Sequence, residues 1–255
     1  MDGDLQLDWG LPALRAQFGP GIELQAVARC GSTNTELLAA CRAGLPRPRL
    51  LVAERQEAGR GRLGRSWSSW PGASLTLSLA WPWAGAALDG LSLAVGAALA
   101  RALDPALRLK WPNDLWLQRR KLGGVLIETM AQGGAPRAVV IGVGLNISAP
   151  PQPSELALAW LQELDPRWSA PLALATLAPA LVDLLQQWPQ QGFAAWQADY
   201  AARDGLCGLR LDVGSLSGVS EGVTAGGELL LRDAQGQLQR VAAGEASVRF
   251  AEPSP

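Results

Sequence analysis

The sequence predicts an α+β fold, in which a mixed β-sheet flanked by helices is followed by a small β-barrel at the C-terminus. Three observations carry this prediction. Apolar residues alternate strictly with polar ones along Ser74–Leu79, as in a strand with one buried face. Apolar residues then recur at helical spacing from Leu88 to Ala102, which places a helix against that sheet. From about Leu206 the pattern changes to short strands separated by glycine turns, which is typical of a small barrel.

The N-terminal half is expected to alternate strands with helices before it reaches a long hairpin. Thr33-Asn34-Thr35-Glu36 matches a capping box, in which the threonine opens a helix that runs to about Ala43. Asp89 is the expected cap of the later helix, and Gly133-Gly134 is the expected turn of the hairpin. The other expected elements are a helix over Leu11–Phe18, strands over Ile22–Val27, Leu50–Gln56, Leu107–Lys110 and Leu115–Leu117, and hairpin strands over Val125–Met130 and Ala138–Ile147.

The C-terminal half begins where the proline-rich segment Ala149–Pro153 interrupts this pattern. Helices are expected after the break over Leu156–Leu164, Leu172–Trp188 and Phe193–Tyr200. We therefore expect a larger domain over residues 1–205 and a smaller one over residues 206–255. The expected strands of the smaller domain are Leu209–Val213, Gly218–Val223, Glu228–Arg232, Gln237–Val241 and Ser247–Phe250.

Composition excludes several classes of function. The chain of 255 residues has a formal net charge of −1, so its arginines form local patches and not a broad surface for a polyanion. The absence of histidine excludes serine–histidine hydrolases and histidine-ligated metal enzymes. The three cysteines have no CxxC spacing, which fits a reducing compartment and no zinc site. An acidic N-terminus and the shortness of the most apolar stretch, Leu91–Leu103, predict a cytoplasmic protein that spans no membrane.

The segment Gly59–Trp67 concentrates the chemistry that binds anions. It places three glycines and three arginines in seven residues and ends on a tryptophan. Glycine lets backbone N–H groups approach a ligand closely, and arginine offers paired donors to carboxylate and phosphate oxygens. The indole adds a flat face for a base. The segment is therefore interpreted as an anion clamp with an aromatic lid, against the alternative of a solvated basic hairpin.

The lysines mark a second region. Arginine supplies 20 of the 22 basic residues, and the only two lysines are Lys110 and Lys121. Each lies in a motif-like setting, Lys110-Trp111-Pro112-Asn113-Asp114 and Lys121-Leu122-Gly123-Gly124. In a chain so rich in arginine, this placement indicates a role for a compact ammonium group that a guanidinium cannot fill. Chance placement is the alternative.

Together these residues resemble the biotin–protein ligase family. The order and spacing of the motifs fit that family from about residue 20 to the C-terminus. The resemblance implies a catalytic domain similar to class II synthetases and an SH3-like C-terminal barrel; the catalytic fold is shared with lipoate–protein ligases, and the glycine–arginine loop favours biotin. The motifs that carry the resemblance are Ser32-Thr33-Asn34, Gln56, Gly59–Trp67, Lys110–Asp114, Lys121–Glu128 and Gly142–Ile147.

The resemblance implies an ATP-dependent ligase with two steps. Biotin is activated with ATP and Mg²⁺ to biotinyl-5'-AMP, and the biotinyl group then passes to a lysine of a biotin carboxyl carrier protein. No bound redox cofactor is implied. Because only about twenty residues precede the first expected strand, we expect a form without the helix-turn-helix domain of the family's repressors, and therefore no DNA binding. A monomer or weak homodimer is expected.

Burial of the biotin ring requires matched donors and acceptors, because an unpaired buried polar group costs about 1–3 kcal/mol. For Ser32 and Thr33, helix capping is an alternative role that is compatible with ligand binding. By resemblance, the biotin-binding residues are Ser32, Thr33, Asn34, Gln56, Arg60, Gly61, Arg62, Lys121 and Gly124.

Activation brings two anions together and therefore needs preorganised positive charge. The resemblance implies catalytic roles for Lys121, Arg62 and Asp114, with Lys121 at the biotin carboxylate and α-phosphate and Asp114 as the candidate ligand of Mg²⁺. Plain turn chemistry is the alternative for Asn113 and Asp114, and core packing is the alternative for Trp67. The implied nucleotide-binding residues are Arg60, Arg62, Trp67, Asn113, Asp114, Lys121 and Asn146.

Two rival functions remain open at this stage. One is a lipoate or octanoyl ligase or transferase of the same fold. The other is a nucleotide- or RNA-binding module that uses Gly59–Trp67 as a clamp, which predicts salt-dependent RNA binding and no turnover. The near-neutral charge and the two lysine motifs disfavour the second.

Overall fold

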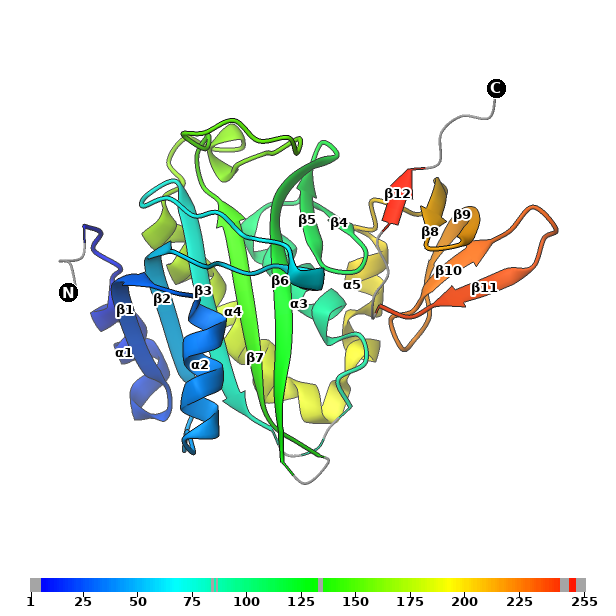
Figure 1. The fold of residues 1–255 in the computed structure, drawn as a ribbon. Helices are drawn as coiled ribbons and strands as arrows, with labels where there is room; N and C mark the ends of the chain where they lie inside the picture. Colours follow the sequence, from blue (N-terminus) through cyan, green and yellow to red (C-terminus); the bar gives the residue numbers. More distant parts are fainter. Residues whose placement is uncertain (1–5, 84, 86, 133–134, 244–247, 251–255) are drawn as a thin grey trace.

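The fold of this chain was obtained as a computed structural model, which describes residues 6–83, 85, 87–132, 135–243 and 248–250. These residues form a seven-stranded sheet with helices on both faces, followed by a smaller five-stranded antiparallel sheet (Figure 1). The α+β fold and its order along the chain are as the sequence predicts.

The large sheet runs in the order β1-β2-β3-β7-β6-β5-β4. Its first two strands pair in parallel and the other neighbours pair antiparallel, so the sheet is mixed. The hairpin of β6 and β7 is confirmed, and its expected turn at Gly133-Gly134 lies outside the described residues. The strands are β1 Glu23–Cys30, β2 Arg49–Gln56, β3 Ser74–Pro82, β4 Arg108–Lys110, β5 Asp114–Leu117, β6 Arg120–Gln132 and β7 Ala135–Asn146.

The helices cover the two faces of this sheet unequally. α3 (Leu91–Leu103) and α4 (Ala170–Gln191) pack side by side behind it, and α2 (Thr33–Arg42) lies in front of β3, β6 and β7 (Figure 1). The face behind the sheet carries the main apolar core, whereas α2 covers only a small second cluster around Leu37 and Cys41. The front face beside α2 is left open for a cleft. The remaining helices are α1 Leu11–Phe18 and α5 Gln197–Ala201.

The strand β3 differs from its prediction. Strict alternation predicted one buried face, but every residue from Ser74 to Ala80 is buried. The leucines face the main core, and the polar residues on the other face are buried beneath the front layer. Thr76 and Ser78 are stable there because each donates a hydrogen bond, Thr76 to the Ala53 carbonyl (2.7 Å) and Ser78 to Asn34 (2.5 Å).

Two helix starts also differ. The capping box at Thr33 is wrong: Ser32 is the N-cap of α2, and Thr33 instead bonds to Gln56 across the fold. The cap of α3 is Gly90 at φ 73° and not Asp89, because only glycine adopts that conformation easily and a Cβ there would meet the Phe193 ring at 2.4 Å.

The helix expected over Leu156–Leu164 is absent; a 3-10 turn over Leu161–Glu163 is all that forms there. The backbone of this segment pairs with the start of β6: Lys121 N–H donates to the Ala157 carbonyl (2.8 Å), and Ala159 N–H donates to the Lys121 carbonyl (2.9 Å). These bonds to Lys121 hold residues 157–159 extended beside the strand. Tertiary pairing therefore overrides the apolar spacing.

α4 is longer than the apolar stretch that the sequence singled out at Leu91–Leu103. It is long and apolar enough to span a bilayer by length and composition. Its apolar side chains, including Leu177, Leu181 and Leu185, are instead buried in the main core. α4 is therefore the central core helix of this fold.

The C-terminal sheet runs in the order β11-β10-β9-β8-β12, as expected of a small SH3-like domain. It packs against the large domain close to the front of the sheet, where Trp111 Nε1 donates to the Gly227 carbonyl (3.0 Å) and Phe250 contacts Trp116 with ring centroids 5.8 Å apart. The boundary at residue 205 stays a prediction. The strands are β8 Arg210–Val213, β9 Leu216–Val223, β10 Leu229–Arg232, β11 Leu238–Val241 and β12 Val248–Phe250.

Candidate active site

A cleft of about 440 Å³ opens on the front face of the large sheet, beside the N-terminus of α2. Its size lies in the range of small-molecule sites. Its floor includes residues of β3, β6 and β7, and its walls include the loop after β2, the turn between β4 and β5, and the extended segment near Leu158. The cleft gathers nearly every residue that the sequence selected: Ser32, Thr33, Asn34, Gln56, Arg60, Gly61, Arg62, Trp67, Asn113, Asp114, Lys121, Gly124 and Asn146.

One end of the cleft, here the neutral end, consists of Ser32, Thr33, Asn34 and Gln56. The Thr33 backbone N–H donates to Gln56 Oε1 (2.7 Å), and the Thr33 hydroxyl oxygen lies 3.1 Å from the same oxygen. The buried Ser78 hydroxyl bridges Thr33 Oγ1 (2.6 Å) and Asn34 Oδ1 (2.5 Å). Ser32 makes no side-chain capping bond in α2. The helix therefore delivers two hydroxyl groups to the cleft on a braced scaffold.

Hydrogen bonds to three other residues hold the Asn34 side chain in place. Its amide nitrogen donates to Glu128 Oε2 (2.9 Å) and the Leu126 carbonyl (3.3 Å), and its oxygen accepts from Ser78. A Cβ at Gly142 would lie 2.3 Å from that oxygen, so only glycine leaves room for this side chain. Asn34 thus acts first as a brace of the neutral end.

The loop Gly59–Trp67 forms a tight hairpin over the cleft. Gly61 N–H donates to the Arg65 carbonyl (2.6 Å), and Trp67 N–H donates to the Gly59 carbonyl (2.9 Å). Leu63 and Gly64 turn the chain with φ of 57° and 71°. A Cβ at Gly59 would approach the Trp67 carbonyl oxygen to 2.4 Å. The spacing of glycines in this loop therefore follows from its backbone shape.

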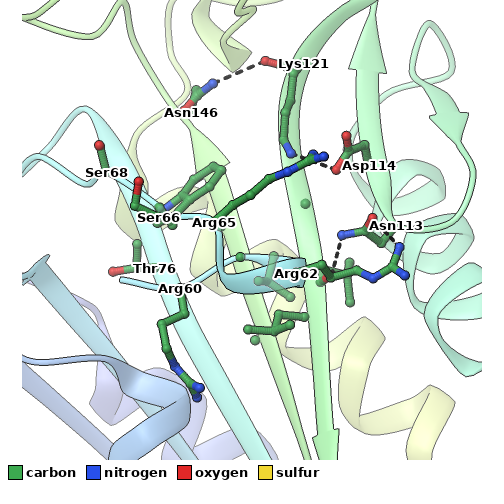
Figure 2. Close-up of a pocket in the computed structure, with 18 of the residues that line it drawn as sticks. Arg60, Arg62, Arg65, Ser66, Ser68, Thr76, Asn113, Asp114, Lys121 and Asn146 are labelled. Atoms are coloured by element: carbon green, nitrogen blue, oxygen red, sulfur yellow. Dashed lines mark hydrogen bonds and ion pairs between the residues drawn. The ribbon is translucent and has the colours of Figure 1, made fainter. Parts of the chain in front are cut away.

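The loop's arginines point in different directions. Arg60 pairs with Glu128 on β6, with its Nη2 atom 2.7 and 2.9 Å from the two carboxylate oxygens. Arg62 donates to Asn113 Oδ1 (3.4 Å) and to the Ala243 carbonyl of the C-terminal domain. Arg65 extends toward Lys121 and Asp114, while Arg60 turns away from them (Figure 2). Arg60 is therefore bound to the sheet in this structure, and its expected place at the nucleotide stays a prediction.

The opposite end of the cleft, here the charged end, consists of Arg62, Arg65, Lys110, Asn113, Asp114 and Lys121. Lys121 Nζ lies 2.8 Å from Asp114 Oδ1 (Figure 2). β5 and β6 pair Asp114 with Gly124, and a Cβ at Gly124 would lie 3.2 Å from that carboxylate oxygen. In this set, four cationic side chains share one carboxylate, so the end is suited to an anion.

Electrostatics at the charged end reflect this crowding. Burial lowers the pKa of the Lys110 ammonium, Asp114 opposes the shift, and the neighbouring charges of Lys121 and Arg65 add to it. Burial also lowers the pKa of the Arg62 guanidinium, again against the attraction of Asp114. The Lys110 ammonium lies 5.1 Å from the centre of the Trp116 ring. A bound anion would relieve the mutual repulsion of these cations.

Trp67 and Asn146 lie on the wall near the C-terminal end of β7. The Trp67 ring packs directly on Gly144, where a Cβ would meet the indole at 2.5 Å. The Asn146 amide nitrogen donates to the Ala159 carbonyl (3.0 Å) and to the Lys121 carbonyl (3.3 Å). Asn146 therefore links β7, Lys121 and the extended segment that pairs with it.

Sequence reasoning did not assign three of these residues to the site. Lys110 was singled out as part of a motif, and Arg65 belongs to the loop Gly59–Trp67, but neither was given a role; both line the cleft. Glu128 ended a quoted motif, yet its pairing with Arg60 and Asn34 depends on contacts between distant segments. Among the residues that the structure describes, no group of His, Cys, Asp or Glu side chains has the form of a metal cluster.

Comparison with known proteins gives relatives for this chain. The family model described as "Biotin/lipoate A/B protein ligase family" matches residues 27–146. The "Biotin--[acetyl-CoA-carboxylase] ligase" of Mycobacterium tuberculosis is 32% identical over 256 residues, which cover 88% of this chain and 88% of that protein. The "Bifunctional ligase/repressor BirA" of Escherichia coli is 36% identical over 214 residues, which cover 79% of this chain. The matched region spans 66% of that relative's length.

Solved structures agree with these relatives. The structure described as "Biotin protein ligase from Aquifex aeolicus in complex with biotin and ATP" aligns with a TM-score of 0.77 at 25% sequence identity. The alignment covers 90% of this chain and 99% of that protein, and so includes both sheets of the fold.

Proposed function

This chain belongs to the biotin–protein ligases, and from that premise we propose that its cleft activates biotin with ATP and passes the biotinyl group to a lysine of a carrier protein. One observation carries the proposal: a neutral hydrogen-bonding end and a cationic end share a single cleft. Biotin has a polar neutral ring at one end and a carboxylate at the other. The cleft matches both ends of that molecule and leaves room for the phosphates of ATP beside the carboxylate.

Biotin binds with its ureido ring at the neutral end. The hydroxyl groups of Ser32 and Thr33, the Gln56 amide and the backbone of Arg60–Arg62 are the partners that we assign to the ring. Thr33 and Gln56 already hold each other in place (2.7 and 3.1 Å), so little side-chain freedom is lost when the ring arrives. The acyl chain then runs along the floor of the cleft toward Lys121.

Adenylation takes place at the charged end. The biotin carboxylate attacks the α-phosphorus, the bond to the β-phosphate oxygen breaks, and pyrophosphate leaves with that electron pair. Lys121 lies between the two approaching anions, and Arg62 and Arg65 neutralise the charge that builds on the phosphate oxygens. We propose that Arg60 anchors the loop to β6 and does not bind the phosphates, because it pairs with Glu128.

Adenine stacks on Trp67, and Asn146 and Asn113 bracket the nucleotide at the charged end. Mg²⁺ enters with ATP as part of the substrate. The carboxylate of Asp114 suits such an ion, because Mg²⁺ at phosphate sites is held mainly by phosphate oxygens and water, with one or two carboxylates. Asp114 must then exchange its bond to Lys121 for the ion.

Transfer consumes the mixed anhydride. The neutral amine of an acceptor lysine attacks the biotinyl carbonyl carbon, the carbon–oxygen bond to the phosphate breaks, and AMP leaves. The names of the relatives in Mycobacterium tuberculosis and Paracoccus denitrificans, both acetyl-CoA-carboxylase ligases, support the biotin carrier domain of a carboxylase as the acceptor. We further propose a cytoplasmic enzyme without a DNA-binding role, acting as a monomer or weak homodimer.

A lipoate or octanoyl enzyme is the second candidate, because the family model covers both classes. The neutral end discriminates between them, since a dithiolane ring offers no donors or acceptors to the polar groups of Ser32, Thr33 and Gln56, whereas the ureido ring of biotin offers both. The test is a transfer assay with MgATP and a carboxylase carrier domain, supplied with biotin or with lipoate. We expect biotin on the carrier lysine only. Lipoyl transfer without biotin transfer would replace this proposal with its rival.

A further inference from the structure

Glu128 is a charged residue of β6 for which the adenylation and transfer steps leave no role. It is not among the residues that line the cleft, yet both of its carboxylate oxygens are engaged. Arg60 of the loop reaches it at 2.7 and 2.9 Å, and the buried Asn34 amide reaches it at 2.9 Å. One carboxylate thus joins the loop Gly59–Trp67 to the braced part of the cleft wall.

The connection continues beyond Asn34. Asn34 accepts from the Ser78 hydroxyl (2.5 Å), whose oxygen also lies 2.6 Å from Thr33 Oγ1, and the Thr33 backbone N–H donates to Gln56 (2.7 Å). These bonds form an unbroken chain from the loop's first arginine to the residues assigned to the biotin ring. A charge-assisted bond at one end polarises and orders such a chain more than an isolated neutral bond does.

We propose that Glu128 is a positioning residue that, by holding Arg60 and Asn34 together, fixes the glycine–arginine loop over the biotin end of the cleft before ligand binds. The loop's backbone N–H groups are then placed for the biotin ring at a smaller entropic cost. This role rests on the proposed function for the identity of the ligand, but its effect on the loop does not.

The direction of the arginine side chains favours this role over a phosphate clamp. Arg62 and Arg65 point to the charged end, while Arg60 turns the other way (Figure 2). Arg60 and Glu128 also join segments 68 residues apart in sequence, so their pair fixes the loop to the sheet and not to itself. A residue in this position is expected to change the affinity for biotin more than the affinity for the nucleotide.

The experiment compares Glu128→Gln with the wild-type chain and with a matched control, Glu221→Gln. Glu221 makes a similar two-oxygen pair with Arg232, in the C-terminal sheet away from the cleft. Biotin and ATP dissociation constants are measured by calorimetry, and hydrogen exchange is measured for residues 59–66 without ligand. For Glu128→Gln we expect faster exchange in this loop, biotin affinity about fivefold weaker, and ATP affinity within about twofold of wild type.

Arg60→Gln removes the other partner of the same ion pair. Because the Arg60 side chain is the more exposed of the two, this variant tests the inference even if Glu128→Gln fails to fold. The two single variants should match, and the double variant should be no weaker than either, since both remove one interaction. Unchanged loop exchange in Glu128→Gln, or additive losses in the double variant, would overturn this inference. If the wild-type chain bound no biotin, the proposed function would fail instead, and the exchange result would still decide the role of Glu128.

Discussion

The neutral and charged ends of the cleft are built in different ways. At the neutral end, short side chains from α2 and β2 are held by one another and by the buried Ser78, so their positions are fixed before ligand arrives. At the charged end, long cationic side chains meet around Asp114, and the ion pair of Lys121 must open for the reaction. The neutral end is thus suited to recognition, because recognition benefits from rigid partners. The charged end is suited to phosphate chemistry, because that chemistry needs charges that can reorganise.

The two ends also differ in how far their polar and charged groups are already paired in the free protein. The neutral end is a closed network of hydrogen bonds, whereas the charged end gathers four cations around one carboxylate, and burial lowers the pKa of its Lys110 and Arg62. An anion therefore gains more from entering the charged end than a neutral group does. This gain is the reason that we propose the phosphates of ATP as the ligand of the charged end.

The largest expected effect comes from Lys121→Arg. The Lys121 ammonium is a compact point charge 2.8 Å from Asp114, and a planar guanidinium in its place would present its charge with a different geometry to the two anions. We expect pyrophosphate release at saturating biotin and ATP to fall by about 100-fold or more, with biotin affinity nearly unchanged. Arg120→Lys is the control, because Arg120 is the neighbour on β6 and pairs with Glu163 instead. Turnover near that of wild type would remove Lys121 from the chemical step.

Substitutions at two glycines of β7 should disturb the neutral end and the wall at Trp67 separately. In Gly142→Ala the new methyl meets the buried Asn34 oxygen, and in Gly144→Ala it meets the Trp67 ring (2.3 and 2.5 Å). We expect the first to lower the free energy of unfolding by about 1–3 kcal/mol and to weaken biotin binding. The second should weaken ATP binding by about tenfold with a smaller loss of stability, because the loop that carries Trp67 can shift. Thermal unfolding and calorimetry check both, and identical profiles for the two variants would mean that the ends are not independent.

A smaller effect concerns pH at the charged end. Because burial favours the neutral amine, Lys110 loses its proton at lower pH than a solvated lysine, whose pKa is about 10.4. Raising the pH therefore removes positive charge from this end, and ATP affinity should fall by about threefold between about pH 8 and pH 10, where the phosphates are already ionised. Lys110→Arg stays charged and should flatten this curve. An equal decline in both proteins would assign the pH dependence to another group.

Much of the fold followed from local patterns, and the failures have identifiable causes. α1 has the predicted bounds, and the barrel strands lie within a few residues of their expected positions, because turns and alternation there are local signals. The helix over Leu156–Leu164 failed because the Lys121 backbone takes up this segment as an extended partner. The capping box failed because Gln56, distant in sequence, offered Thr33 a better partner than its own helix did.

The site could be predicted where a local motif contains the functional residues. It could not be predicted where a residue's position depends on contacts between segments that are distant in sequence. The glycine–arginine loop and the two lysine motifs led to Lys121, Arg62 and Asp114, which the fold brings to one cleft. The separate direction of Arg60 depends on Glu128 lying opposite the loop, which no local pattern encodes. Lys110 and Arg65 have positions in the cleft that follow only from the register of β4 with β5 and the shape of the loop.

The central claim is that one cleft joins biotin to ATP, with recognition at the neutral end and chemistry at the charged end. Its most direct test is mass spectrometry of the products after the chain is mixed with biotin and MgATP in the absence of an acceptor. We expect biotinyl-5'-AMP and pyrophosphate in equal amounts, with the adenylate retained on the protein, and both products formed about 100-fold more slowly by Lys121→Arg. A folded wild-type chain that binds both ligands and forms no adenylate, or forms one from lipoate and not from biotin, would contradict it.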